Sequence, residues 1–181
     1  IERDGTAPAS GHRRRGPLDR PVRRPVAHHD LPAGGISSTF RIGAEDYGID
    51  ILQVQEVRSY EAPTRIAQTQ PQVLGVLNLR GEIVPVIDMR LQLGLAQANF
   101  DDSTVVIVLK VGARVFGLVV DGVSDVIGLA PEQLRPVPAL GCGIAADLLL
   151  AIATVKERLL LLVDIDKLMC HPALGLKAPT R

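Results

Sequence analysis

The feature that most constrains this chain is a repeated pattern of short apolar runs joined by tight turns. No long stretch of helical periodicity separates these runs. Two such runs on either side of a tight turn are typical of a β-hairpin. The predicted hairpins join 40–42 to 47–49, 73–80 to 83–89, 104–110 to 115–120 and 148–155 to 159–165.

Some of these runs are apolar at every position, as at 105–109. Both faces of such a strand must be covered, whereas a sheet with one face in water would alternate between apolar and polar residues. The chain has 3 Phe, 2 Tyr and no Trp, so its core must consist mainly of Val, Leu and Ile. We therefore predict a mainly β fold of closed barrels packed together.

One segment departs from the strand pattern. Asp50 resembles a helix cap, and Ile51, Val54 and Val57 follow at i, i+3 and i+6 spacing. This spacing predicts one or two helical turns rather than another strand, with Glu56 near their end.

One predicted strand contains a proline. Pro85 lies inside a predicted strand and cannot donate a backbone hydrogen bond, so its nitrogen should face an edge or a bulge.

Asp164 and Asp166 precede a short helical segment that ends near Cys170. The two carboxylates can bind a cation or share a proton, but the favoured interpretation is that one of them caps the helix.

Residues 1–36 differ sharply from the rest of the chain. They hold seven arginines and four acidic residues and almost nothing apolar, so we expect a disordered basic tail followed by one domain at 37–181. The arginines at 13–15 and 23–24 can bind phosphate, which raises nucleic acid as a partner. The tail has no aromatic residue for base stacking, so a solvated linker is favoured. His28 and His29 lack the further ligands that a metal site needs.

The remaining composition favours a cytoplasmic protein. Cys142 and Cys170 are two thiols without a pairing motif, which suits a reducing compartment. No apolar run approaches the roughly 20 residues of a membrane helix, and the start lacks the apolar core of a signal peptide.

The sequence contains no recognisable catalytic motif. It lacks a phosphate-binding loop, a dinucleotide fingerprint, an HExxH zinc motif and a nucleophile elbow. His171 is the one histidine outside the tail and has no evident nucleophile to activate, and Cys142 has no nearby base. We expect no enzyme activity, no cofactor, no metal and no small-molecule substrate.

A different kind of candidate site involves Arg80, which closes an apolar strand just before Gly81. An arginine beside a residue that permits close backbone approach suits contact with a carboxylate. A plain surface charge at a turn is the alternative interpretation from spacing alone.

Several sequence blocks resemble the CheW family of bacterial chemotaxis coupling proteins. The resemblance is carried by FRIGAEDYGIDI at 40–51, VQEV at 54–57, GVLNLRGEIVPVIDMR at 75–90, VVDGVSDV at 119–126, LRPVP at 134–138 and LLLVDIDKL at 160–168. The blocks occur in order over about 39–170. Ser37-Ser38 and Ala151-Ile152-Ala153 depart from the family pattern, and the tail has no counterpart in it.

The resemblance implies two packed, five-stranded SH3-like β-barrels with short helices and a non-catalytic signalling adaptor. Such an adaptor joins the cytoplasmic hairpin tips of transmembrane chemoreceptors to the regulatory domain of the histidine kinase CheA, in receptor arrays at the inner membrane. Matched positions imply receptor contact at Val54, Glu56 and Arg80, and kinase contact near Gly75 and Gly81.

Two alternatives remain from the sequence. A CheW-like scaffold can serve another chemosensory pathway, such as surface motility or second-messenger control. The less favoured one is a nucleic-acid-associated protein that acts through its basic tail.

Overall fold

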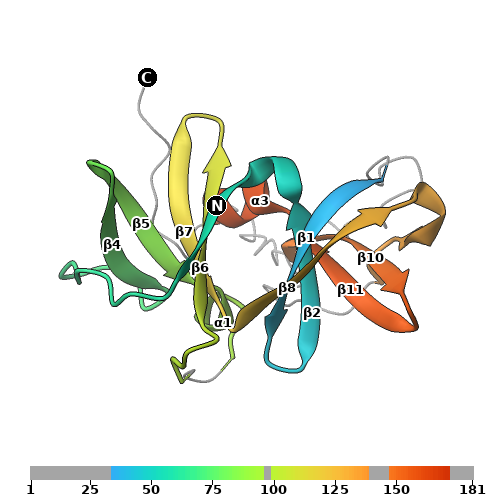
Figure 1. Cartoon of the computed structure of the whole chain (residues 1–181), viewed down its shortest axis with the longest axis horizontal. Coiled ribbons are helices and arrows are strands. Elements are labelled where there is room, and N and C mark those ends of the chain that lie inside the picture. Colours follow the sequence, from blue (N-terminus) through green and yellow to red (C-terminus); the bar gives the residue numbers. More distant parts are fainter. Residues whose placement is uncertain (1–33, 96–98, 139–146, 172–181) are drawn as a thin grey trace, which may run out of the picture.

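The computed structural model describes residues 34–95, 99–138 and 147–171, which form two β-sheets (Figure 1). The five-stranded sheet has the order β3 (Val54–Ser59), β6 (Val105–Val111), β7 (Arg114–Val120), β5 (Glu82–Asp88) and β4 (Val73–Leu79). The six-stranded sheet has the order β8 (Gly122–Leu129), β1 (Gly35–Ile42), β2 (Glu45–Asp50), β11 (Arg158–Val163), β10 (Leu149–Val155) and β9 (Leu134–Arg135). Short helices are η2 (Ile51–Gln53), α1 (Met89–Gln92), η3 (Pro131–Gln133) and α3 (Ile165–Cys170).

The five-stranded sheet closes on itself. Its edge strands are β3 and β4, and the chain that follows β3 crosses to the free side of β4. There Thr64 and Val76 exchange two backbone hydrogen bonds of 2.9 Å. In the six-stranded sheet the chain passes from one edge strand, β8, through η3 to the other, β9. The mainly β fold of two packed barrel-like sheets is therefore confirmed, with the two-residue β9 as a sixth strand in one sheet.

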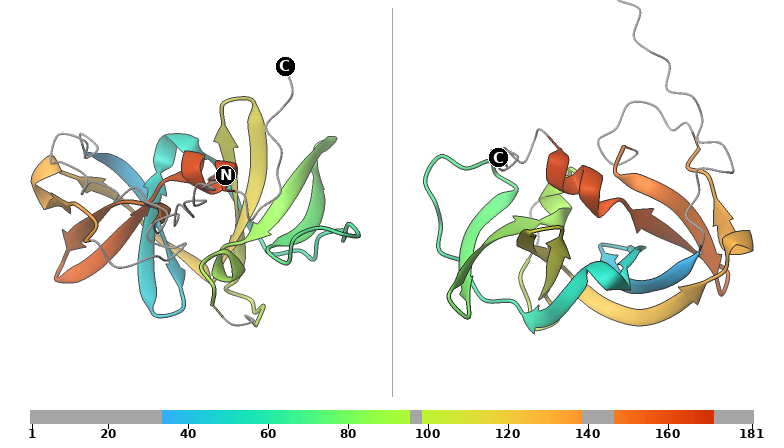
Figure 2. Two further views of the ribbon diagram at one scale, coloured as in Figure 1. Left: turned by 180° about the vertical axis from the view of Figure 1, so that it is seen from behind. Right: turned by 90° about the horizontal axis from the view of Figure 1, so that it is seen from above.

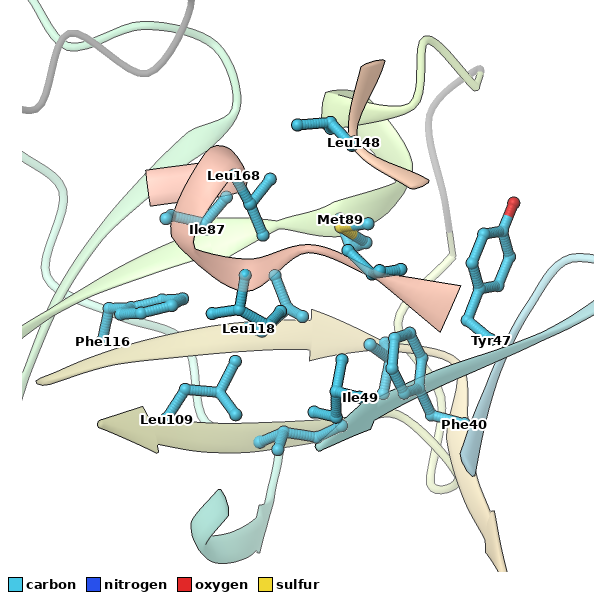
Figure 3. Close-up of a cluster of buried hydrophobic side chains, with 14 of the residues drawn as sticks. Phe40, Tyr47, Ile49, Ile87, Met89, Leu109, Phe116, Leu118, Leu148 and Leu168 are labelled. Atoms are coloured by element: carbon cyan, nitrogen blue, oxygen red, sulfur yellow. The ribbon is translucent and has the colours of Figure 1, made fainter. Parts of the chain in front are cut away.

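The main core lies between the two sheets. Phe40 and Ile49 from the six-stranded sheet meet Leu109, Phe116 and Leu118 from the five-stranded sheet, and all of these side chains are buried (Figure 3). The helix α3 covers the junction and contributes buried Ile165, Leu168 and Met169 (Figure 2). Because strands of both sheets contribute to one core, burial of apolar surface holds the sheets together.

The predicted hairpins are present, but one local prediction was wrong. Only Ile51–Gln53 is helical, whereas Val54–Ser59 is the strand β3. Asp50 does cap the helical turn, because its side chain accepts a hydrogen bond from the Leu52 amide. The apolar spacing failed as a helix signal because this segment pairs with β6 as a strand, on which Val54 is half-buried and Val57 is exposed.

The Pro85 prediction is confirmed in part. β5 is an inner strand, but its pairing with β7 begins at Val86, just after the proline. Pro85 lies opposite Val76, whose N–H and C=O both bond to Thr64 instead. The proline nitrogen therefore faces away from β4, on a side where no ladder bond is needed.

The carboxylate pair before α3 is confirmed as a cap. Asp164 accepts a hydrogen bond from the Lys167 amide at 3.0 Å, and Asp166 lies inside the first turn of the helix. The cap is thus formed by Asp164 alone, because Asp166 is a residue of the helix itself. At the other end of the chain, β1 begins at Gly35 and includes two residues that we assigned to the tail. The arginine runs, His28, His29 and Cys142 lie outside the described residues.

Candidate functional site

The candidate site is a surface ion pair on the five-stranded sheet. Arg80 begins the turn between β4 and β5, and its Nη2 donates to Oε2 of Glu56 on β3 at 2.9 Å. The Arg80 side chain is 81% exposed and that of Glu56 is 27% exposed. The pair links two segments at opposite edges of the sheet order, and one of its partners remains largely in solvent.

The turn has a conformation that favours this presentation. Arg80 has φ +53° and Gly81 has φ +89°, both in the left-handed region. The Gly81 amide donates to the side-chain oxygen of Asn78 at 2.9 Å, which closes the turn. Arg80 therefore has a backbone conformation that non-glycine residues rarely adopt, and its side chain contacts Glu56 from this turn.

A shallow concavity of about 120 Å³ lies beside the ion pair. Its lining combines charge with apolar side chains: Gln55, Glu56, Leu79, Arg80, Glu82, Val84, Val108 and Val115. An arginine at the rim of a depression lined by both charged and apolar side chains is a composition compatible with a protein-binding spot.

Val54, the third residue predicted for receptor contact, lies on β3 two residues before Glu56. It is only half-buried, but it packs against the core between the sheets. The structure therefore brings Glu56 and Arg80 together, while Val54 supports the same strand from its inner side. Exposed apolar residues also lie in this region: Leu52 on η2 is 88% exposed, and Val57 on β3 and Ile83 on β5 are exposed as well. The sequence interpretation missed Leu52 as a surface residue.

The two predicted kinase-contact glycines lie at opposite ends of β4. Gly75 is near its start and Gly81 follows its end, about 20 Å apart at the usual rise of a strand. Gly75 has φ +148°, and a Cβ there would lie 2.2 Å from the Thr64 carbonyl oxygen. Its glycine requirement thus comes from the contact that closes the sheet, whereas Gly81 has open space around it.

A buried charge cluster was not found by the sequence analysis. The Arg90 side chain on α1 is 3% exposed and that of Asp88 is 2% exposed. Nε and Nη2 of Arg90 donate to the two carboxylate oxygens of Asp88, each at 3.1 Å. Its Nη1 donates to Asp121 at 2.7 Å. Burial alone would lower the pKa of Arg90, but the hydrogen bonds to these carboxylates raise it above its ordinary value, so the guanidinium is charged. The one sequence signal was an arginine two residues after a helix-capping aspartate.

Among residues 34–95, 99–138 and 147–171, no group of three or more His, Cys, Asp or Glu is placed to hold a metal ion. Within the same residues, no helix is long and apolar enough to cross a membrane.

Comparisons with known proteins agree with this architecture. Residues 38–172 match the CheW-like domain family. The chain is 50% identical over 137 residues to a chemotaxis protein CheW of Klebsiella aerogenes, covering 76% of this chain and 82% of that protein. It is 32% identical over 129 residues to a probable chemotaxis protein CheW of Rhizobium etli, covering 71% and 83% respectively.

The fold also matches a solved structure, the scaffolding protein TtCheW from Thermoanaerobacter tengcongensis. The TM-score is 0.70 at 26% identity, covering 75% of this chain and 92% of the other. The family match over most of the chain and the close relative agree with the blocks that carried the sequence resemblance. The chain therefore belongs to the CheW family and is a scaffold adaptor of chemotaxis signalling.

Proposed function

We propose that this adaptor joins a chemoreceptor to the histidine kinase CheA without performing catalysis, in the cytoplasm at receptor arrays. The observation that carries the proposal is the Glu56–Arg80 pair, which presents a guanidinium beside a depression lined by charged and apolar side chains. A receptor hairpin tip is a pair of helices with apolar and charged side chains, and such a tip can seat an apolar residue beside a charge pair. Coupling then requires contacts that differ between the kinase-on and kinase-off arrangements.

Reversing the charge of Arg80 tests the receptor site. The exposed ion pair contributes only about 0–1 kcal/mol to stability, so we expect Arg80→Glu to fold normally. It places two carboxylates side by side at the centre of the proposed contact, and we expect receptor affinity to fall about 30-fold. Co-sedimentation with receptor cytoplasmic fragments measures this loss, and circular dichroism checks the fold.

The six-stranded sheet offers a matched control. Arg158 forms a similar exposed ion pair with Asp46 at 3.4 Å, so Arg158→Glu makes the same charge change elsewhere. We expect receptor binding to survive in that variant. Equal loss in both variants would mean that net charge, not this site, governs binding. Restored binding in the swapped pair Glu56→Arg/Arg80→Glu would show that the pair itself is recognised.

Gly81 supports the proposed kinase contact, because the turn leaves open space where a side chain would stand. Gly81→Asn adds bulk there while keeping a residue type that tolerates positive φ. We expect affinity for the CheA regulatory domain to fall about tenfold, with receptor binding retained. Calorimetric titration of each partner separately measures the two affinities, and unchanged kinase affinity would remove Gly81 from the contact surface.

A further inference from the structure

The chain passes between the two sheets at two places in the described residues. The first is η2, which joins β2 to β3. The second is Asp121 alone, the single residue between β7 of the five-stranded sheet and β8 of the six-stranded sheet. A one-residue connection leaves few backbone dihedrals through which the two sheets can change their relative orientation.

Asp121 also bonds to both sides of this junction. Its Oδ2 accepts a hydrogen bond from the amide of Gly43, in the turn between β1 and β2, at 2.6 Å. Its own amide donates to the carbonyl oxygen of Arg41 at 3.0 Å. Both contacts attach Asp121 to the β1–β2 hairpin of the six-stranded sheet.

On the other side, Oδ1 of Asp121 accepts from Arg90 at 2.7 Å. Arg90 lies on α1, two residues after the end of β5, and its two hydrogen bonds to Asp88 fix the guanidinium against the five-stranded sheet. The guanidinium also lies over the Phe100 ring at 4.9 Å, and that ring stacks on Tyr60 at 4.3 Å. One carboxylate therefore connects a rigidly held arginine of one sheet to a backbone amide of the other.

The apolar core between the sheets supplies attraction that is non-directional, and the interdigitation of its side chains adds shape complementarity. Charged hydrogen bonds depend on distance and angle. We propose that Asp121 is a positioning residue that fixes the orientation of the two sheets relative to each other. We call the contacts among Gly43, Asp88, Arg90 and Asp121 the inter-sheet latch.

The consequence for signalling rests on the proposed function. An adaptor within an array must hold several contacts at once, and these combine only when its surfaces meet their partners at one defined angle. The Glu56–Arg80 surface lies wholly on the five-stranded sheet, so a loose latch leaves that single contact intact. Assembly that also engages the six-stranded sheet would be weakened.

Asp121→Asn breaks the latch with almost no change in volume. Both carboxylate oxygens accept hydrogen bonds from donors, and an amide offers one acceptor and one donor group, so one of the two links must be lost. Residual dipolar couplings measured on the strands of each sheet report their relative orientation directly. We expect one alignment tensor to fit both sheets in the unaltered chain and two different tensors to be needed in the variant.

The binding measurements use the full chain with receptor fragment and CheA. We expect receptor binding alone to change less than about twofold and co-assembly of all three proteins to weaken about tenfold. Asp125→Asn on β8 is the control, because that carboxylate accepts a hydrogen bond from the neighbouring Val126 amide of the same strand. We expect neither readout to change in this variant. Arg90→Lys disrupts the inter-sheet latch independently, since the ammonium of lysine cannot form the set of hydrogen bonds that the planar guanidinium makes to Asp88 and Asp121.

A single shared tensor together with normal co-assembly in Asp121→Asn would overturn the proposal. Should Asp121→Asn fail to fold, the same two readouts on Arg90→Lys decide it. If the unaltered chain binds neither receptor nor kinase, the proposed function fails, and the dipolar couplings still decide whether the latch fixes the sheets.

Discussion

Replacing Gly75 by alanine is expected to lower the free energy of unfolding by about 2–4 kcal/mol, a large share of the stability of a domain of this size. The added Cβ would lie 2.2 Å from the Thr64 carbonyl oxygen, and φ +148° is strained for any residue with a side chain. Relief of the clash requires Thr64 to move away from β4, which breaks the two hydrogen bonds that close the five-stranded sheet. Urea denaturation followed by circular dichroism measures the change.

This result separates two explanations for the glycine. Gly81→Asn is the matched control, because Gly81 also has positive φ but no atom within 4 Å of the added Cβ. We expect Gly81→Asn to cost about 1 kcal/mol or less. If Gly75→Ala keeps full stability and loses only kinase binding, Gly75 is a contact residue and the structural account of it is wrong.

The elements of the fold that the sequence predicted are those set by local signals. Turns and apolar runs lie next to each other in the chain, so the hairpins 73–80/83–89 and 104–110/115–120 were found with nearly correct ends. The strand order was not predictable in this way, because parallel pairs such as β5 with β7 and β11 with β2 join distant segments. β8 was missed because most of its residues are exposed and it shows no strong apolar run.

The candidate site shows the same division. The sequence analysis named Glu56 and Arg80 as candidate contact residues, but it did not predict that they bond to each other. Their 2.9 Å contact depends on the fold of the sheet, which brings β3 near the β4–β5 turn. The latch was missed for a similar reason. Arg90 and Asp121 are 31 positions apart, and Gly43 and Asp121 are 78 apart, so no local pattern marks them as partners. A buried arginine also contradicts the usual assumption that charge lies at the surface.

Replacing Arg90 by methionine is expected to have the largest effect of all, a loss of about 3–5 kcal/mol in the free energy of unfolding. Methionine fills much of the space but leaves the Asp88 carboxylate buried without its cation. Asp121 also loses a charged partner, although its own side chain keeps some contact with solvent. Urea denaturation measures the loss, and an unchanged slope would show that the folded state stays equally compact.

The double variant Asp88→Asn/Arg90→Met identifies the cause of that loss. Asparagine removes the charge but keeps an oxygen that can accept the residue-90 amide hydrogen bond, so α1 retains its cap. We therefore expect the double variant to be more stable than Arg90→Met alone, because no uncompensated charge remains at position 88. If instead the two costs add, the destabilisation comes from lost packing around the Arg90 side chain, including its contact with Phe100, and not from an unpaired buried carboxylate.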